Sequence, residues 1–61
     1  MLNKSDVSMA EWCRLFRENY PIPYRTLEQA EDAANRLKAE QVVYDDSLDA
    51  FGARYYVFAP K

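Results

Sequence analysis

The run RYYVFA, which begins at Arg54, has apolar side chains on both of its sides if it forms a strand. Successive side chains of a strand face opposite ways, so Tyr55 and Val57 would lie on one side. Tyr56 and Phe58 would lie on the other. A strand with one solvated face alternates apolar and polar residues, whereas a strand covered on both faces does not. This run therefore needs cover on both sides, from the chain itself or from a partner.

The chain offers little material for that cover. Its 61 residues predict a single small domain over residues 1–61, and a domain of this size buries only about 60% of its unfolded surface. Cys13 is the only cysteine and there is no histidine, so neither an internal disulfide nor a Cys/His zinc site can add stability. We expect two helices to cover one face of a sheet well, but hardly both.

A leftover aromatic face predicts an interface, because tyrosine and phenylalanine are favoured in contact cores. Two alternatives need no partner. In one, the N-terminal segment of the chain wraps the second face. In the other, the tyrosine hydroxyls simply point into water.

Two capping boxes predict two helices. Ser8 followed by Glu11 opens the first, over residues 8–19, and its apolar residues recur at helical spacing. The alternative there is a strand over residues 12–16. Thr26 and Gln29 open the second helix, which has a narrow alanine-rich stripe and requires something bulky to pack closely on it.

The remaining segments read as extended structure. The prolines of YPIPY, residues 20–24, break a helix and favour a short connector or a brief edge strand. Residues 41–45 and 54–59 predict two strands of a C-terminal hairpin. The fold class we expect is α+β, with two helices packed on one face of that antiparallel hairpin. The alternative is a βαββ arrangement in which residues 12–16 form a strand.

The acidic segment between the two predicted strands starts like a calcium loop. Asp45, Ser47 and Asp49 have the right spacing, but an EF-hand needs glycine at its sixth position and glutamate at its twelfth. Ala50 and Tyr56 stand there instead. We therefore expect a solvated turn and no metal site.

The sequence also lacks the parts of an enzyme. Cys13 has no histidine to activate it, and a single glycine cannot build a phosphate loop. We expect no catalysis and no cofactor. The net charge of −2 makes nucleic acid an unlikely partner. No run approaches the ~20 apolar residues that span a bilayer, so we expect no membrane association, and the lone cysteine fits a cytoplasmic location.

Several short matches to a known family occur in order along the chain: Trp12, Pro21-Ile22, TLEQA from Thr26 to Ala30, Ala34, and APK from Ala59 to Lys61. The sequence resembles the small podovirus proteins that bind and inhibit the bacterial host RNA polymerase. The resemblance implies a short, acidic, non-enzymatic protein with one helix and a small antiparallel sheet. That family binds the polymerase through arginines of its last strand, where this chain has only Arg54.

These observations predict a non-catalytic protein-binding module, which can be a phage-type inhibitor that docks on a larger host protein. Aromatic side chains would supply the contact, and aspartates would steer a basic partner by long-range attraction. The alternatives are a self-associating structural protein, in which the same face closes a homodimer, and a single-strand nucleic-acid binder. The predicted partner-binding residues are Tyr44, Asp45, Asp46, Asp49, Arg54, Tyr56 and Phe58.

Overall fold

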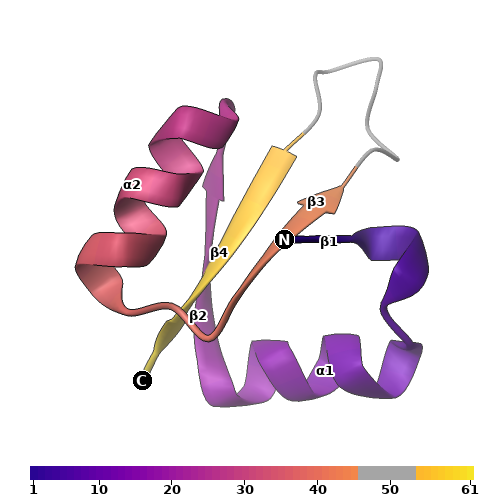
Figure 1. Ribbon diagram of the computed structural model, residues 1–61. Helices are drawn as coiled ribbons and strands as arrows, with labels where there is room; N and C mark the ends of the chain where they lie inside the picture. The colour runs from indigo at the N-terminus through magenta and orange to yellow at the C-terminus, as the bar shows by residue number, and fades with distance from the viewer. Residues whose placement is uncertain (46–53) are drawn as a thin grey trace.

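The computed structural model describes residues 1–45 and 54–61, and within them the chain forms a four-stranded sheet with two α-helices (Figure 1). The strand order is β1-β3-β4-β2. Strand β4 is antiparallel to both of its neighbours, and β1 runs parallel to β3. The elements are β1 (Leu2–Asn3), the 3₁₀ helix η1 (Lys4–Asp6), α1 (Met9–Glu18), β2 (Asn19–Tyr24), α2 (Leu27–Leu37), β3 (Gln41–Asp45) and β4 (Arg54–Pro60).

The α+β class and both predicted helices are confirmed, and the strand alternative for residues 12–16 is wrong, because those residues lie inside α1. The Ser8 hydroxyl oxygen accepts a hydrogen bond from the Glu11 backbone N–H at 3.2 Å. The Thr26 hydroxyl oxygen accepts one from Gln29 in the same way, also at 3.2 Å. Each bond satisfies a backbone donor that the first helical turn leaves without a partner.

Helix α2 ends on a residue in the left-handed region. Lys38 has φ 54° and ψ 49°, and its backbone N–H donates to the Ala34 carbonyl. Any residue other than glycine pays roughly 1–2 kcal/mol in this region. The turn brings the chain back to the sheet, where the Glu40 N–H donates to the Phe58 carbonyl at 2.9 Å.

The YPIPY segment forms the edge strand β2, which is one of the two forms predicted for it. Pro21 pairs with Phe58 and Pro23 pairs with Tyr56 across the β2–β4 ladder. Proline has no backbone N–H, so the N–H groups that β2 donates to β4 must come from the residues that alternate with the prolines, such as Ile22. The positions that lack an N–H therefore face the outer edge of the sheet. This edge is therefore blocked against pairing with a further strand.

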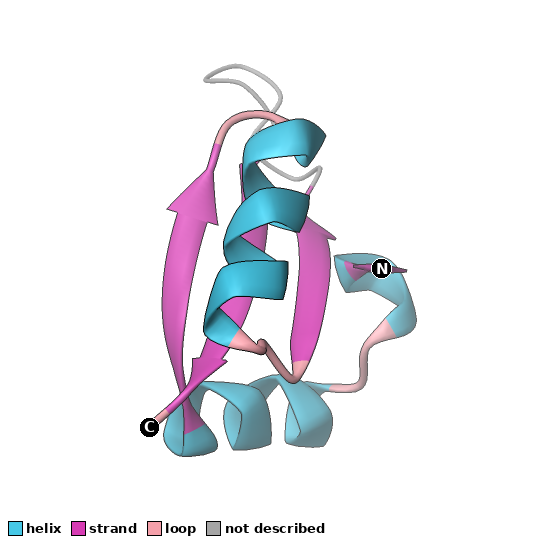
Figure 2. Ribbon diagram, turned by 60° about the vertical axis from the view of Figure 1, so that its left-hand side comes forward, coloured by secondary structure: helices cyan, strands magenta, loops and turns pink. Residues whose placement is uncertain are grey.

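The two helices lie on opposite faces of the sheet, so the expectation that they share one face is wrong. Val57 packs against Ala30 and Ala33 of α2. Its neighbour Phe58 points the other way and packs with Leu15 of α1. Figure 2 shows α2 running along the strands, whereas α1 crosses near one end of the sheet. The alternative in which the N-terminal part of the chain covers the second face is the one that the structure shows.

Two helices are enough to cover both faces because the sheet is narrow. The side chains of Val57 and Phe58 are fully buried although each is covered by a single helix. Alanines let α2 come close to the strands, while bulky rings fill the space under α1. No helix in the described part of the chain has the length and apolar character needed to cross a membrane.

Candidate functional site

The structure divides the predicted partner-binding residues between surface, core and opposite faces. Arg54 is exposed and Tyr56 is half-buried, and both side chains lie on the face of the sheet that α1 covers. Phe58 lies on that face too, but it is 0% exposed. The prediction that Phe58 contacts a partner is therefore wrong, because Leu15 and Val43 enclose it.

Asp45 is buried rather than solvated. Asp45 is the last residue of β3 and lies opposite Arg54 in the ladder. It is 4% exposed, and its carboxylate Oδ2 lies 3.9 Å from the Lys4 ammonium nitrogen. The prediction that it belongs to a wet turn and steers a partner is wrong, since the N-terminal segment folds over it and supplies a countercharge. Asp46 and Asp49 lie outside the described residues.

Tyr44 lies on the opposite face from Tyr56. Its ring packs against that of Tyr55, with centroids 4.9 Å apart, and Tyr24 pairs with Tyr55 from the other side. These three tyrosines form one cross-strand row on the α2 face. Tyr44 and Tyr56 therefore cannot belong to a single flat contact surface.

Sequence reasoning missed a cluster of rings between α1 and β4. The Trp12 centroid lies 4.8 Å from Phe16 and 5.9 Å from Tyr56, and Phe16 lies 6.4 Å from Tyr56. The buried Phe58 ring forms the base of the cluster, 5.4 Å from Phe16. Phe16 remains 39% exposed, and Met9, one helical turn before Trp12, is 74% exposed. We call Met9, Trp12, Phe16 and Tyr56 the aromatic patch.

A signal for the patch was present in the sequence. The apolar residues of the first helix span a wide arc, which includes Met9 and Phe16 as well as Leu15. Only Leu15 among these is fully buried against the sheet. An arc wider than the buried contact leaves apolar surface facing solvent on one flank of the helix.

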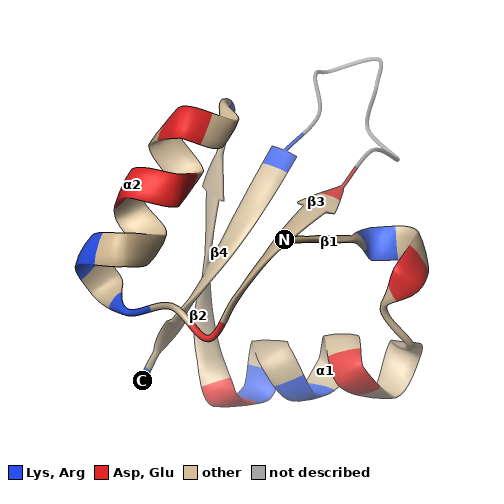
Figure 3. Ribbon diagram, viewed as in Figure 1, with Lys and Arg blue, Asp and Glu red and all other residues tan. Residues whose placement is uncertain are grey.

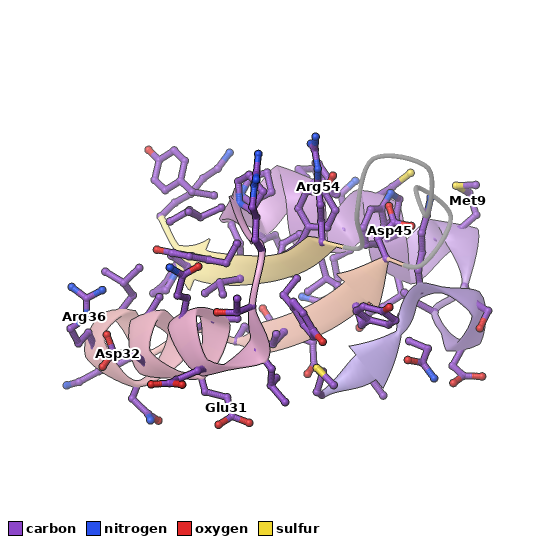
Figure 4. All side chains as sticks on the ribbon, turned by 90° about the horizontal axis from the view of Figure 1, so that it is seen from above. Met9, Glu31, Asp32, Arg36, Asp45 and Arg54 are labelled. Carbon is purple, nitrogen blue, oxygen red and sulfur yellow. The ribbon has the colours of Figure 1, made fainter. Side chains whose placement is uncertain are left out.

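The charges beside the patch are cationic. Arg17 and Arg54 are exposed, and neither has an ion-pair partner among the described residues. In Figure 3 the positions of the acidic residues of α2, coloured red, lie in the first part of the helix, and a basic position follows near its end. In Figure 4, Arg54 and Met9 project on the side of the sheet away from Glu31 and Asp32.

Arg14 is the centre of the largest ion cluster, on the other flank of α1. Its guanidinium donates to Glu11 at 2.9 Å, to Glu18 at 3.3 Å, and to both carboxylate oxygens of Glu40. The buried Asn19 amide also donates to Glu40, at 3.2 Å. These bonds tie α1 to the start of β3 and β2.

The hydrogen bonds of this cluster shift the ionisation of its members. Those from Arg14 hold the pKa of Glu11 below its usual value, and those from Arg14 and then Asn19 do the same for the pKa of Glu40. The same bonds, which Glu11 and then Glu40 accept, raise the pKa of Arg14 further. All of these carboxylates accept hydrogen bonds from Arg14, so the cluster works as a clamp between α1 and the start of β2 and β3.

Among the described residues, no group of three or more acidic or cysteine side chains is placed to hold a metal ion. No protein-family model matches the sequence, and the comparisons with curated proteins and with solved structures also give no match.

Proposed function

We propose that this chain is a small non-catalytic protein-binding module, a phage-type inhibitor that docks on a larger host protein. The observation that supports this most is the exposed Arg54 beside Tyr56, whose ring packs against Trp12. Arg54 and Tyr56 project from the same face of β4. Asp45 lies opposite Arg54 in the ladder and is paired with Lys4, and Arg54 itself forms no ion pair with a described residue. Arginine and tyrosine are among the residues that most often dominate binding energy at interfaces.

The scaffold holds these two residues rigidly. Strand β4 is central in the sheet, paired on one side with β2 and on the other with β3. The Tyr56 ring meets Trp12 edge to face. Contacts of this kind restrict the ring before a partner arrives, so less conformational entropy is lost on binding.

The order of elements also supports an inhibitor of this type. From Asn19 to Pro60 the chain forms a strand, a helix and two further strands, and the three strands pair antiparallel. The podovirus resemblance implies one helix with a small antiparallel sheet and a contact arginine on the last strand. Bacterial RNA polymerase is therefore the first partner to test, and a partner of this kind places the chain in the cytoplasm.

The two alternative functions fit this surface less well. In an isologous dimer whose two-fold axis passes through Arg54, the two arginines would face each other, and like charges in a contact are unfavourable. A single-stranded nucleic acid needs open ring faces for stacking. Here Trp12 meets Tyr56 edge on, and the Lys4 ammonium lies over the Trp12 ring at 5.3 Å from its centroid.

The test measures binding of the fluorescently labelled chain to purified bacterial RNA polymerase by anisotropy. We expect Arg54→Glu to weaken binding by at least about tenfold, which corresponds to about 1.4 kcal/mol. The matched control is Arg36→Glu, which makes the same charge change on α2, on the far side of the sheet (Figure 4). That control should bind as the wild type does.

A second arm covers partners other than the polymerase. Wild type and Arg54→Glu, with isotopically distinct labelling, are compared in quantitative capture from bacterial lysate, and both are checked for folding by circular dichroism. If neither arm shows a protein that the wild type binds and Arg54→Glu loses, the proposed function is overturned. If only the lysate arm succeeds, the chain is a binding module whose target is not the polymerase.

A further inference from the structure

We propose that an extended segment of the partner pairs as a strand with the outer edge of β3, in place of β1, and puts an apolar side chain into the hollow between β3 and α2. This inference rests on the proposed function, which supplies the partner. It concerns a different part of the surface, the edge of the sheet farthest from β2. The podovirus resemblance does not involve β1, because the strand, helix and two strands that fit it begin only at Asn19.

The two edges of the sheet are closed in different ways. Prolines block the edge at β2, whereas the other edge is formed by β1, which has only two residues. Leu2 and Asn3 pair in parallel with Val43 and Tyr44, and both residues of β1 are exposed. Parallel pairing is slightly less stable per residue than antiparallel pairing. Of the three pairings in the sheet, the one between β1 and β3 is therefore the easiest for an incoming strand to replace.

One backbone donor on this edge is bound by a side chain instead of by a strand. The Val42 N–H donates to Oε1 of the preceding residue, Gln41, at 3.1 Å. Alternate residues of a strand bond to the neighbour on each side, so Val42 belongs to the residues of β3 that face away from β4. The residues of β1 pair only with Val43 and Tyr44. A segment that follows the whole of β3 could offer a carbonyl to the Val42 N–H once the Gln41 side chain turns away.

A hollow of about 330 Å³ lies beside the same stretch of edge, between α2 and β3. The apolar part of its lining comes from Met1, Leu27, Ala34, Ala39 and Val42. Met1 would leave with β1, and it loses little contact because it is 63% exposed. When a peptide adds a strand to a sheet, main-chain hydrogen bonds hold it and pockets for alternate side chains select its sequence. The hollow would receive a side chain that points towards α2.

The charges at the hollow favour an uncharged side chain there. Glu31 and Glu40 belong to its lining. Glu40 already accepts hydrogen bonds from Arg14 and Asn19. Glu31 is exposed and forms no ion pair with a described residue. A carboxylate of the partner would be repelled by both, whereas an apolar side chain gains from the aliphatic lining.

The backbone of the edge determines the kind of occupant. A nucleic acid lacks the alternating N–H and C=O groups that continue a strand ladder. A second copy of this chain would have to offer an edge strand of its own. Among the described strands, β3 and β4 are paired on both sides, β2 carries prolines and β1 has two residues. None of them matches the five residues of β3, whereas an extended segment of a larger partner can.

The experiment selects peptides from a phage-displayed random library on the immobilised full chain. We expect the enriched peptides to contain a bulky apolar residue, and the affinity of labelled copies is measured by anisotropy. Leu27→Gln makes the lining of the hollow polar and should weaken binding by about tenfold. The matched control is Leu37→Gln on the same helix, because Leu37 is 39% exposed against 37% for Leu27 and lies outside the lining. That control should bind the peptides as the wild type does.

A second readout follows the backbone directly. Hydrogen exchange of the full chain is measured by NMR with and without a saturating amount of a selected peptide. We expect the peptide to slow exchange of the Val42 amide and to leave the amides of β2 unchanged. Gln41→Ala removes the side-chain acceptor that occupies the Val42 N–H, so this variant should bind the peptide at least as tightly as the wild type.

The outcomes separate this inference from the proposed function. Strand pairing at β3 is overturned if no peptide is enriched, if the peptides bind Leu27→Gln as tightly as wild type, or if exchange of the Val42 amide is unchanged. Dimerisation of the free chain that slows Val42 exchange without any peptide overturns it in favour of a second copy. The Arg54→Glu comparison uses no peptide and no residue of this edge, so the proposed function stands or falls on that comparison alone.

Discussion

The two faces of the sheet are closed by helices of opposite character. On the α2 face, Ala30 and Ala33 are fully buried against Val57, so small side chains let the helix lie close along the strands. On the α1 face, Leu15 and Phe58 are fully buried, but Phe16 stays 39% exposed because the helix crosses only one end of the sheet. Alanines bring the middle of α2 close to the strands, although Leu27 and Leu37 at its two ends stay 37% and 39% exposed. On the other face, large rings fill the space between α1 and the sheet.

The residues of the proposed contact, Arg54 and Tyr56, lie on the α1 face. One strand, β4, supplies the buried residue of both faces, so the strand alone does not distinguish them. The two faces differ in the helix that packs on each, α1 on one and α2 on the other. The following three predictions test that contrast, from the largest expected effect to the smallest.

Removing the ring at the base of the aromatic patch should have the largest effect. We expect Phe58→Ala to lower the free energy of unfolding by about 3–5 kcal/mol, because it leaves a cavity under α1. A chain of 61 residues has only about 3–9 kcal/mol in total, so the variant should be largely unfolded. Urea titration followed by circular dichroism measures this. Phe16→Ala should cost clearly less, and an equal cost would show that the α1 face is as closed as the other.

Enlarging the close contact on the α2 face should have an intermediate effect. Ala33 is 0% exposed, so Ala33→Leu should push α2 away from the sheet and cost about 1–3 kcal/mol. The matched control is Ala10→Leu, because Ala10 is exposed on α1. The same urea titration compares the two variants. A site that accepts leucine at position 33 without loss would disprove the close approach of α2.

Acid should loosen the α1 face slightly and leave the α2 face unaffected. The folded-state pKa values of Glu11 and Glu40 lie below the usual 4.5. The stability that they contribute is therefore present above pH 4.5 and lost as the pH falls through their lowered values. The effect is small because the cluster is exposed to solvent. Trp12 fluorescence reports it, as a shift that Arg14→Gln should remove and Arg36→Gln should not. If the pH-dependent change in Trp12 fluorescence persists in Arg14→Gln, the acid response does not come from the Arg14 cluster.

Local features of the fold could be predicted from the sequence. The Ser8 and Thr26 caps fix where both helices begin, and the apolar runs fix β3 and β4 to within a residue. Each of these depends on neighbours a few positions away. The two-sided pattern of β4 also correctly required cover on both faces.

The features that could not be predicted depend on contacts distant in sequence. Asp45 looks like a turn residue until Lys4 is placed beside it, and Glu40 has no visible partner until Arg14 reaches it. The division of the helices between the faces follows from how close α2 can approach, which periodicity does not encode. For the same reason Phe58 was placed at the candidate site and Phe16 was not.

The central claim is that the chain seals both faces at β4 and leaves open the flank of α1 that carries Met9 and Phe16. It is tested most directly by NMR of the free protein with a soluble paramagnetic agent, which broadens signals of solvent-accessible protons. The account predicts strong broadening for the Met9 methyl and the Phe16 ring, and protection for Val57 and Phe58. Comparable broadening of Phe58 and Phe16 would contradict it, because α1 would then not be covering the sheet.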